Sequence, residues 1–219
     1  MDEQMNSLVL GLAGSPCRGG STDKLLDAFL AGAQEAGAET KLLQIPLLKI
    51  APCDDCDGCA RDGKCAIEDD FQEVNRQIIA ADVIVLSAPL YFAGLPARVK
   101  CLVDRSQCQW VRKYRLHASL PLSQRGYARR KGILLCAGGD PHANFEGVRR
   151  TVRYFFNVYE TDYSDELLIA GADGQGAIDT QVLQAASALG RQACACRKDV
   201  KVRQKNRSLT ETQECSDRW

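Results

Sequence analysis

The chain has few of the side chains that usually act as general acids or bases, and it has no long apolar run. Only two histidines, His117 and His142, occur in 219 residues, and we expect both at the surface rather than in catalysis. No run of about eighteen apolar residues is present to span a membrane. The start Met1-Asp-Glu-Gln lacks the basic and apolar regions of a signal peptide. These absences predict a cytoplasmic protein with no membrane partner and no catalytic side chain.

The chain also lacks an excess of either charge. Lys+Arg and Asp+Glu each number 28, so the composition gives no reason to expect a nucleic-acid partner. The charges are unevenly placed, because residues 98–153 are rich in Arg and Lys whereas residues 54–70 are acidic. The acidic residues are Asp54, Asp55, Asp57, Asp62, Glu68, Asp69 and Asp70. Solvation or pairing within the chain explains them most simply; the alternative is complementarity between subunits or toward an acidic redox partner.

Cysteine, by contrast, is abundant and clustered. The chain has 11 cysteines, and Cys53, Cys56, Cys59 and Cys65 follow a C-x2-C-x2-C-x5-C spacing. Bacterial ferredoxins open with the same run of two-residue spacers around an iron–sulfur cubane, although their fourth cysteine serves a second cluster. Here Cys65 follows after one short loop, in which glycines supply a flexible backbone. The segment therefore predicts one locally closed [4Fe-4S] cluster.

The clustered cysteines have three alternative roles. Structural zinc prefers two separated C-x2-C pairs, which this compact triplet fits poorly. A disulfide framework belongs to small secreted domains, whereas this chain is long and has an odd number of cysteines. In the third alternative, the thiols are reduced and hold no metal. The interpretation we favour is a cytoplasmic metalloprotein.

Short apolar segments alternate with helical periodicity along residues 1–196, which predicts one α/β domain. The expected strands are 8–13, 40–45, 82–87, 132–137 and 166–170, and the expected helices are 23–36, 71–81, 96–114, 148–158 and 181–195. Nearly all-apolar strands that alternate with helices indicate a parallel sheet covered on both faces. Five strands suit a flavodoxin-like three-layer sandwich of order 2-1-3-4-5. Residues 117–131 look like an insertion, and residues 197–219 like a polar C-terminal tail.

In such a sheet, ligands bind at the carboxyl ends of the strands where the strand order reverses. The loop after the first strand, residues 14–22, offers glycine amides, three hydroxyls and one arginine at a helix N-terminus, which suits a phosphate. The candidate phosphate-binding residues are Ser15, Arg18, Gly20, Ser21 and Thr22. The loop lacks both the Walker A pattern and the G-x-G-x-x-G pattern, so a mononucleotide is favoured over ATP or a dinucleotide. A plain helix cap is the alternative.

Two further loops are expected beside this one. Residues 88–94 follow the third strand and place two aromatic side chains next to a proline, which suits a planar ring. Taken singly, each aromatic is more often a core residue than a cofactor contact. The candidate ring-binding residues are Pro89, Leu90, Tyr91 and Phe92. After the fourth strand, Gly138 and Gly139 permit close approach of a flat ligand. Sites for a phosphate, a ring face and a ring edge together predict FMN.

Several segments of the chain resemble the iron–sulfur flavoproteins, which belong to the NADPH-dependent FMN reductase branch of the flavodoxin-like superfamily. They are Gly14-Ser15-Pro16 through Thr22, the cysteine cluster followed by Ile67-Glu-Asp-Asp70, Ala88-Pro-Leu-Tyr91, and Lys100 through Asp104-Arg105. The similarity extends from about residue 7 to residue 195. The chain differs from the family at Cys17 and Ser21, where family loops usually read Ser-Pro-Arg and Gly-Asn-Thr.

The resemblance implies FMN on the core, a [4Fe-4S] cluster after the second strand, and a homodimer or homotetramer in which a cluster lies near a neighbour's flavin. We therefore expect a redox flavoprotein that transfers electrons between FMN and the cluster, with NAD(P)H or a ferredoxin as redox partner. One alternative is an NAD(P)H-dependent FMN or quinone reductase, or a flavin-dependent dehydrogenase of a small organic substrate. Another is a zinc-stabilised flavodoxin-like binding module.

Overall fold

The sheet of this computed structural model has five parallel strands in the order β2-β1-β3-β4-β5, as predicted. The structure describes residues 6–121, 130–172 and 178–195. The strands are β1 (Leu8–Ala13), β2 (Glu39–Gln44), β3 (Val83–Pro89), β4 (Arg130–Ala137) and β5 (Thr161–Ile169). β1 and β3 are buried over nearly their whole length, because both faces of a central parallel strand are covered by helices.

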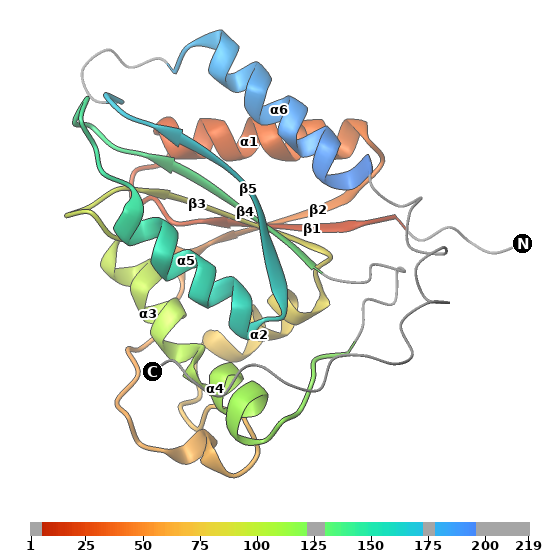
Figure 1. Ribbon diagram of the computed structural model, residues 1–219, viewed down its shortest axis with the longest axis vertical. Coiled ribbons are helices and arrows are strands. Elements are labelled where there is room, and N and C mark those ends of the chain that lie inside the picture. The colour runs from red at the N-terminus through yellow and green to blue at the C-terminus, as the bar shows by residue number, and fades with distance from the viewer. Residues whose placement is uncertain (1–5, 122–129, 173–177, 196–219) are drawn as a thin grey trace, which may run out of the picture.

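Two helical layers cover the sheet. α1 (Ser21–Glu35) and α6 (Thr180–Ala195) lie on one face, and α2 (Phe71–Ala80), α3 (Ala97–Arg105) and α5 (Glu146–Val158) lie on the other (Figure 1). Alternate strand residues point into two apolar clusters, with Val9 and Val83 toward α1 and α6, and Leu10 and Ile84 toward the opposite layer. This arrangement confirms the flavodoxin-like three-layer sandwich.

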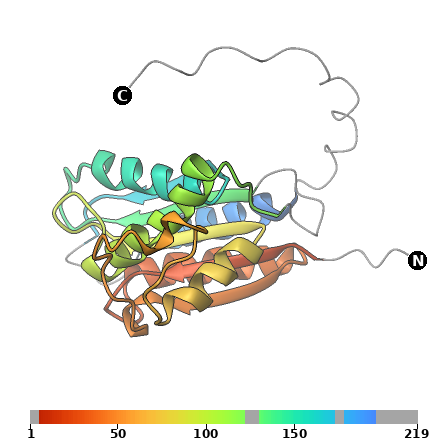
Figure 2. The ribbon, with the colours of Figure 1, turned by 90° about the horizontal axis from the view of Figure 1, so that it is seen from below.

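The segment expected to be one helix over 96–114 is three short helices instead. α3 ends at Arg105, α4 spans Gln107–Trp110, and a π-helix spans Val111–Arg115. At the first break, the Ser106 hydroxyl donates to the Leu102 carbonyl at 2.9 Å, and such a bond to the preceding turn tends to bend a helix. The break turns the chain toward the long loop that leaves β2, which lies at the bottom of Figure 1 and nearest the viewer in Figure 2.

Other differences from the predicted boundaries fall on polar residues. β4 begins at Arg130, inside the predicted 117–131 insertion, because the buried Arg130 guanidinium donates to the carbonyls of Ile79 and Pro121. β5 begins at Thr161 rather than Glu166, since an edge strand leaves one face exposed and tolerates polar side chains. Residues 122–129 and the predicted tail 197–219 lie outside the described residues. In the part of the chain that is described, no helix has the length and apolar character needed to cross a membrane.

Candidate functional site

The loops after β1 and β3 are joined directly at the carboxyl edge of the sheet. The amide of Gly14 donates to the Ser87 carbonyl at 2.7 Å, and the Ser87 hydroxyl donates to the Thr22 carbonyl at 2.7 Å. A Cβ atom at Gly14 would lie 2.6 Å from a methyl carbon of Val99 on α3 and 3.0 Å from the Ser87 carbonyl oxygen, so a side chain here would force α3 or β3 to shift. The structure therefore brings the first turn of α1 beside the end of β3.

The candidate phosphate loop is ordered by its own side chains. The Ser15 hydroxyl accepts from the Cys17 amide at 3.1 Å, and the Asp23 carboxylate accepts from the Gly19 amide at 3.0 Å. Ser15, Gly20 and Ser21 are half-buried, while Thr22 is only 3% exposed. The predicted residues thus surround the N-terminus of α1, where backbone amides favour an anion.

Arg18 lies near two carboxylates of α1. It lines a cavity of about 260 Å³ together with Asp23, Asp27 and Gln44. Burial raises the pKa of Asp27, as does the charge of Asp23, while Arg18 opposes both effects. In this conformation, the Arg18 guanidinium balances these acids at the start of α1.

The turn after β3 projects from the sheet and exposes its aromatic side chains. Leu90 is tied to β4 by its amide, which donates to the Ala137 carbonyl at 2.8 Å, and Tyr91 and Gly94 exchange backbone hydrogen bonds across the turn. Phe92 has a φ of 49° and is fully exposed. Such a conformation is uncommon for a bulky residue, so the turn is held in a strained form.

Glycines let the neighbouring loops approach this turn closely. A Cβ atom at Gly138 would lie 3.2 Å from Leu90, and one at Gly147 would lie 2.3 Å from the Ala93 carbonyl oxygen. The sequence pattern predicted Gly138 and Gly139 but gave no signal for Gly147, which stands in the first turn of α5. The structure therefore gathers the three predicted loops at one edge of the sheet, as a mononucleotide site requires.

The cysteine loop makes a tight wrap between β2 and α2. Asp55 and Asp57 have φ values of 55° and 54°, and Gly63 has 71°, so three positions adopt the left-handed conformation that reverses the chain. Gly58 is needed for space instead, because a Cβ atom there would lie 2.7 Å from that of Ala66. Both glycines of the cysteine run are therefore required, for different reasons.

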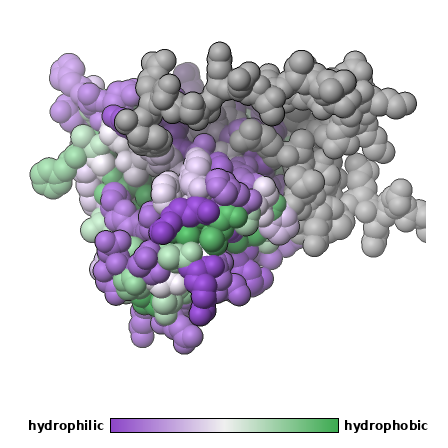
Figure 3. All heavy atoms as spheres, turned by 60° about the horizontal axis from the view of Figure 1, so that its bottom comes forward, coloured by the Kyte–Doolittle hydropathy of each residue, from purple (hydrophilic) through white to green (hydrophobic). Residues whose placement is uncertain are grey.

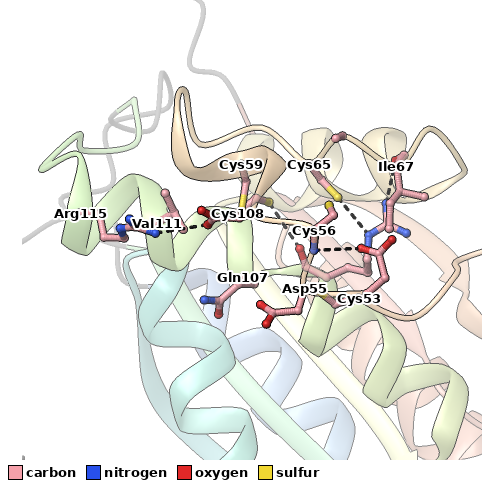
Figure 4. A pocket seen from close by; sticks show the side chains of 14 residues that line it. Cys53, Asp55, Cys56, Cys59, Cys65, Ile67, Gln107, Cys108, Val111 and Arg115 are labelled. Atoms are coloured by element: carbon pink, nitrogen blue, oxygen red, sulfur yellow. Dashed lines mark hydrogen bonds and ion pairs between the residues drawn. The ribbon is translucent and has the colours of Figure 1, made fainter.

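All four predicted cysteines line one pocket (Figure 4). Cys53 and Cys56 are exposed, and Cys59 and Cys65 are half-buried. Burial raises the pKa of Cys59, and the neighbouring thiols Cys65 and Cys53 raise it further. Binding of a metal would therefore have to displace a proton held more firmly than usual.

The donor atoms of the pocket indicate which group its residues could hold. All four predicted ligands are thiols that line one pocket, and four cysteine thiolates are the ligand set of a [4Fe-4S] cluster. Among the described residues, no group of three or more Cys, His, Asp or Glu side chains is arranged to hold a single metal ion. The residues therefore fit an iron–sulfur cluster by the chemistry of their donors.

The far wall of this pocket comes from a segment for which the sequence predicted no role. Arg105, Gln107, Cys108, Val111 and Arg115 complete the lining. Cys108 is buried, which raises the pKa of its thiol to about 12. A signal for Arg105 was present, since it continues the buried stripe of Val99 and Leu102 on α3, where a charged side chain must have partners.

The face that carries the loop mixes hydrophobic and hydrophilic side chains (Figure 3). Asp54, Asp55, Asp57, Asp62 and Glu68 are exposed there. Arg115 forms an ion pair with Asp57 at 3.4 Å, so part of the predicted charge complementarity is satisfied within the chain. Arg61 pairs with Asp62 at 3.8 Å, and Asp54, Asp55 and Glu68 add further exposed carboxylates to this loop.

Several known proteins are similar to this chain in sequence. The family model described as NADPH-dependent FMN reductase matches residues 7–145. An iron–sulfur flavoprotein of Methanosarcina thermophila is 39% identical over 45% of this chain and 51% of its own length. One from Methanocaldococcus jannaschii is 31% identical over 69% of this chain and 72% of its own length. The chain spans about half the length of several curated relatives that it matches.

Solved structures agree on the fold. A flavone reductase superposes with a TM-score of 0.64 at 20% identity, covering 89% of this chain and 64% of its own. An NAD(P)H:quinone oxidoreductase from Methanothermobacter marburgensis superposes with a TM-score of 0.60 at 19% identity, covering 86% and 96%. The fold class is thus that of the flavodoxin-like reductases. The chain belongs to the NADPH-dependent FMN reductase family, among its iron–sulfur flavoproteins, which confirms the resemblance seen in the sequence.

Proposed function

We propose that this chain is an oxidoreductase whose cysteine loop binds a [4Fe-4S] cluster and whose loops after β1, β3 and β4 bind FMN. The observation that carries the proposal is that Cys53, Cys56, Cys59 and Cys65 line one pocket in a chain of this family. When bound, the flavin exchanges one or two electrons and the cluster one at a time, so that the two together link hydride carriers to single-electron carriers.

The protein's own residues have distinct tasks in this proposal. Gly20, Ser21 and Thr22 present amides and hydroxyls to the phosphate at the N-terminus of α1. The turn Pro89–Phe92 would line the flavin ring, and Gly138 and Gly139 would let the ring approach the backbone. The four cysteines of the loop would hold the iron beside several exposed carboxylates.

The electron donor is proposed to be NAD(P)H or a reduced ferredoxin-type protein, and the assembly a homodimer or homotetramer. A second candidate, NAD(P)H-dependent reduction of free FMN, a quinone or another small organic molecule, is supported by the description of the matching family model. Stopped-flow reduction separates the two. Rapid flavin reduction by NADPH, followed by turnover of a quinone, supports the second candidate, whereas reduction only by ferredoxin supports the first.

Anaerobic purification tests the cofactors directly. We expect brown protein with about four iron and four sulfide per chain and a released flavin that is FMN. Stoichiometric zinc without sulfide contradicts the cluster, and recovery of FAD contradicts the mononucleotide site. Thr22→Leu is expected to weaken FMN binding by about tenfold or more, because a hydrogen bond to a charged group is lost, while Thr22→Ser keeps the hydroxyl and most of the affinity.

A further inference from the structure

Arg105 is a fully buried charged residue whose partners all belong to the cysteine loop or to the start of α2. It is the last residue of α3, and its side chain is 0% exposed. The Asp69 carboxylate neutralises it through contacts of 2.6 and 3.2 Å, and the guanidinium lies 4.8 Å from the centre of the Phe71 ring. A charge buried in this way is stable only because every donor finds an acceptor.

Two of these acceptors flank the cysteine run. The Ala51 carbonyl, two residues before Cys53, accepts from Nη1 at 3.0 Å, and the Ile67 carbonyl, two residues after Cys65, accepts from Nη2 at 2.8 Å. One planar guanidinium therefore ties together the two ends of the loop and fixes them to α3. A lysine could not make this set of contacts, because its ammonium is a single point.

The remaining donor points at a predicted iron ligand. Nε of Arg105 lies 3.2 Å from Sγ of Cys65, and Cys65 is the half-buried cysteine that closes the run. Hydrogen bonds to ligand sulfurs and nearby positive charge are among the factors that set the potential of an iron–sulfur centre. Both stabilise the reduced state, because reduction adds negative charge.

We propose that Arg105 is the positioning residue of the iron site. It clamps both ends of the cysteine loop, and it donates an N–H to the Cys65 sulfur that raises the reduction potential of the bound cluster. This inference rests on the proposed function. Replacement of a purely structural arginine would change the stability of the loop but would leave the reduction potential of the cluster unchanged.

Redox titration of anaerobically prepared protein tests the proposal. Arg105→Gln removes the positive charge and the planar set of guanidinium donors, and Arg105→Lys keeps only the charge. Arg98→Gln is the matched control. Arg98 is exposed on the same helix and, within the part of the chain that the structure describes, donates to the Leu48 carbonyl at 3.5 Å. We expect the midpoint potential to fall in the order wild type, Arg105→Lys, Arg105→Gln, with the control close to wild type.

A second measurement follows iron release to a chelator in the same samples. Loss of an outer-shell partner typically costs about 10- to 100-fold in metal affinity, so release is expected to be at least about tenfold faster in Arg105→Gln. An Arg105→Gln protein that holds its cluster with wild-type potential and wild-type release overturns the proposal.

Wild-type protein labelled with ¹⁵N-arginine decides the case if both Arg105 variants fail to fold. Electron spin-echo spectra of the reduced cluster should show coupling to an arginine nitrogen, and spectra without it overturn the proposal. Iron and sulfide analysis of the same wild-type sample separates the two levels of inference. Wild-type protein without sulfide contradicts both the proposed function and this inference. Wild-type protein that holds the cluster, with variants of unchanged midpoint potential and iron release, contradicts this inference alone.

Discussion

The four cysteines of the loop differ in how firmly the surrounding protein holds each side chain. Cys65 contacts Arg105, and Cys59 is half-buried beside the core formed by α2 and β1. Cys53 and Cys56 are exposed, so the fold does not depend on their packing. Replacement of an exposed cysteine therefore tests ligation with little effect on folding.

Cys56→Ser is expected to remove most of the iron while it leaves the sheet folded. A serine hydroxyl is a poor ligand for iron in place of a thiolate. Iron analysis and thermal unfolding of the apo-protein measure the two effects separately. Cys101→Ser is the control, because Cys101 lies on α3 outside the pocket lining and should keep its iron. Full iron in Cys56→Ser would remove this cysteine from the ligand set.

A separate ion pair joins α5 to the edge strand. Nε and Nη2 of Arg149 donate to Glu166 at 2.8 and 2.7 Å, and Tyr163 donates to the same carboxylate. These bonds, that from Arg149 above all, lower the pKa of Glu166 below its ordinary value of 4.5. A carboxylate with a depressed folded pKa adds stability above its unfolded pKa and loses it as the pH falls through the folded value.

Glu166→Gln is therefore expected to lower the free energy of unfolding at pH 7 by about 1 kcal/mol. The difference between variant and wild type should shrink below about pH 4, where the wild-type carboxylate becomes protonated. Urea unfolding at several pH values measures it. Glu39→Gln, whose partner Lys41 lies 3.5 Å away at an exposed site, should show almost no change. A difference that grows toward acid would contradict this assignment.

At the scale of secondary-structure elements, the crossing of α1 and α6 depends on two glycines. A Cβ atom at Gly32 would lie 2.0 Å from the Ser187 carbonyl oxygen, and one at Gly190 would lie 2.0 Å from that of Phe29. The helix backbones are thus in direct contact. Glycine is unfavourable inside a helix by about 1 kcal/mol relative to alanine, so close packing explains why it stands at both positions.

Gly190→Ala should destabilise the protein by about 2 kcal/mol despite the higher helix propensity of alanine, because the added methyl overpacks the crossing. Chemical denaturation measures the change. Gln192→Ala, at an exposed position on the same helix, should be neutral or slightly stabilising. If Gly190→Ala proves as stable as wild type, the two helices do not pack this closely.

At the scale of the whole molecule, two kinds of loop leave the carboxyl edge of the sheet. The loops after β1, β3 and β4 meet at that edge, whereas the cysteine loop runs from β2 beyond the helical layer of α2 and α3 (Figure 1). An acidic face on the cysteine loop and arginines and lysines in residues 98–153 belong to the same chain. A neighbouring copy therefore offers complementary charge.

We expect a homodimer or homotetramer whose interface is weakened by salt. Multi-angle light scattering at micromolar protein, at low and at high ionic strength, measures the mass. Asp54→Asn together with Asp55→Asn should weaken assembly, whereas Glu35→Gln, at an ion pair on the opposite helical layer, should not. A monomer at low salt would contradict this prediction.

The sequence by itself determined the sheet and the cysteine segment, because both depend on local patterns. Apolar runs specified β1 and β3, and the four cysteines are neighbours along the chain, so one loop brings them together. Strand boundaries were less accurate where polar residues such as Arg130 and Thr161 begin strands, since their burial depends on partners distant in the sequence.

Only the tertiary structure decided the contacts that join distant segments. Arg105 reaches Cys65 across 40 positions, Gly147 lies beneath the turn after β3, and Gly190 fits against Phe29 on another helix. No spacing along the chain connects the two members of any of these pairs. The residue required at each position depends on what the fold places against it, and that placement exists only once the sheet has formed and the helices have packed on it.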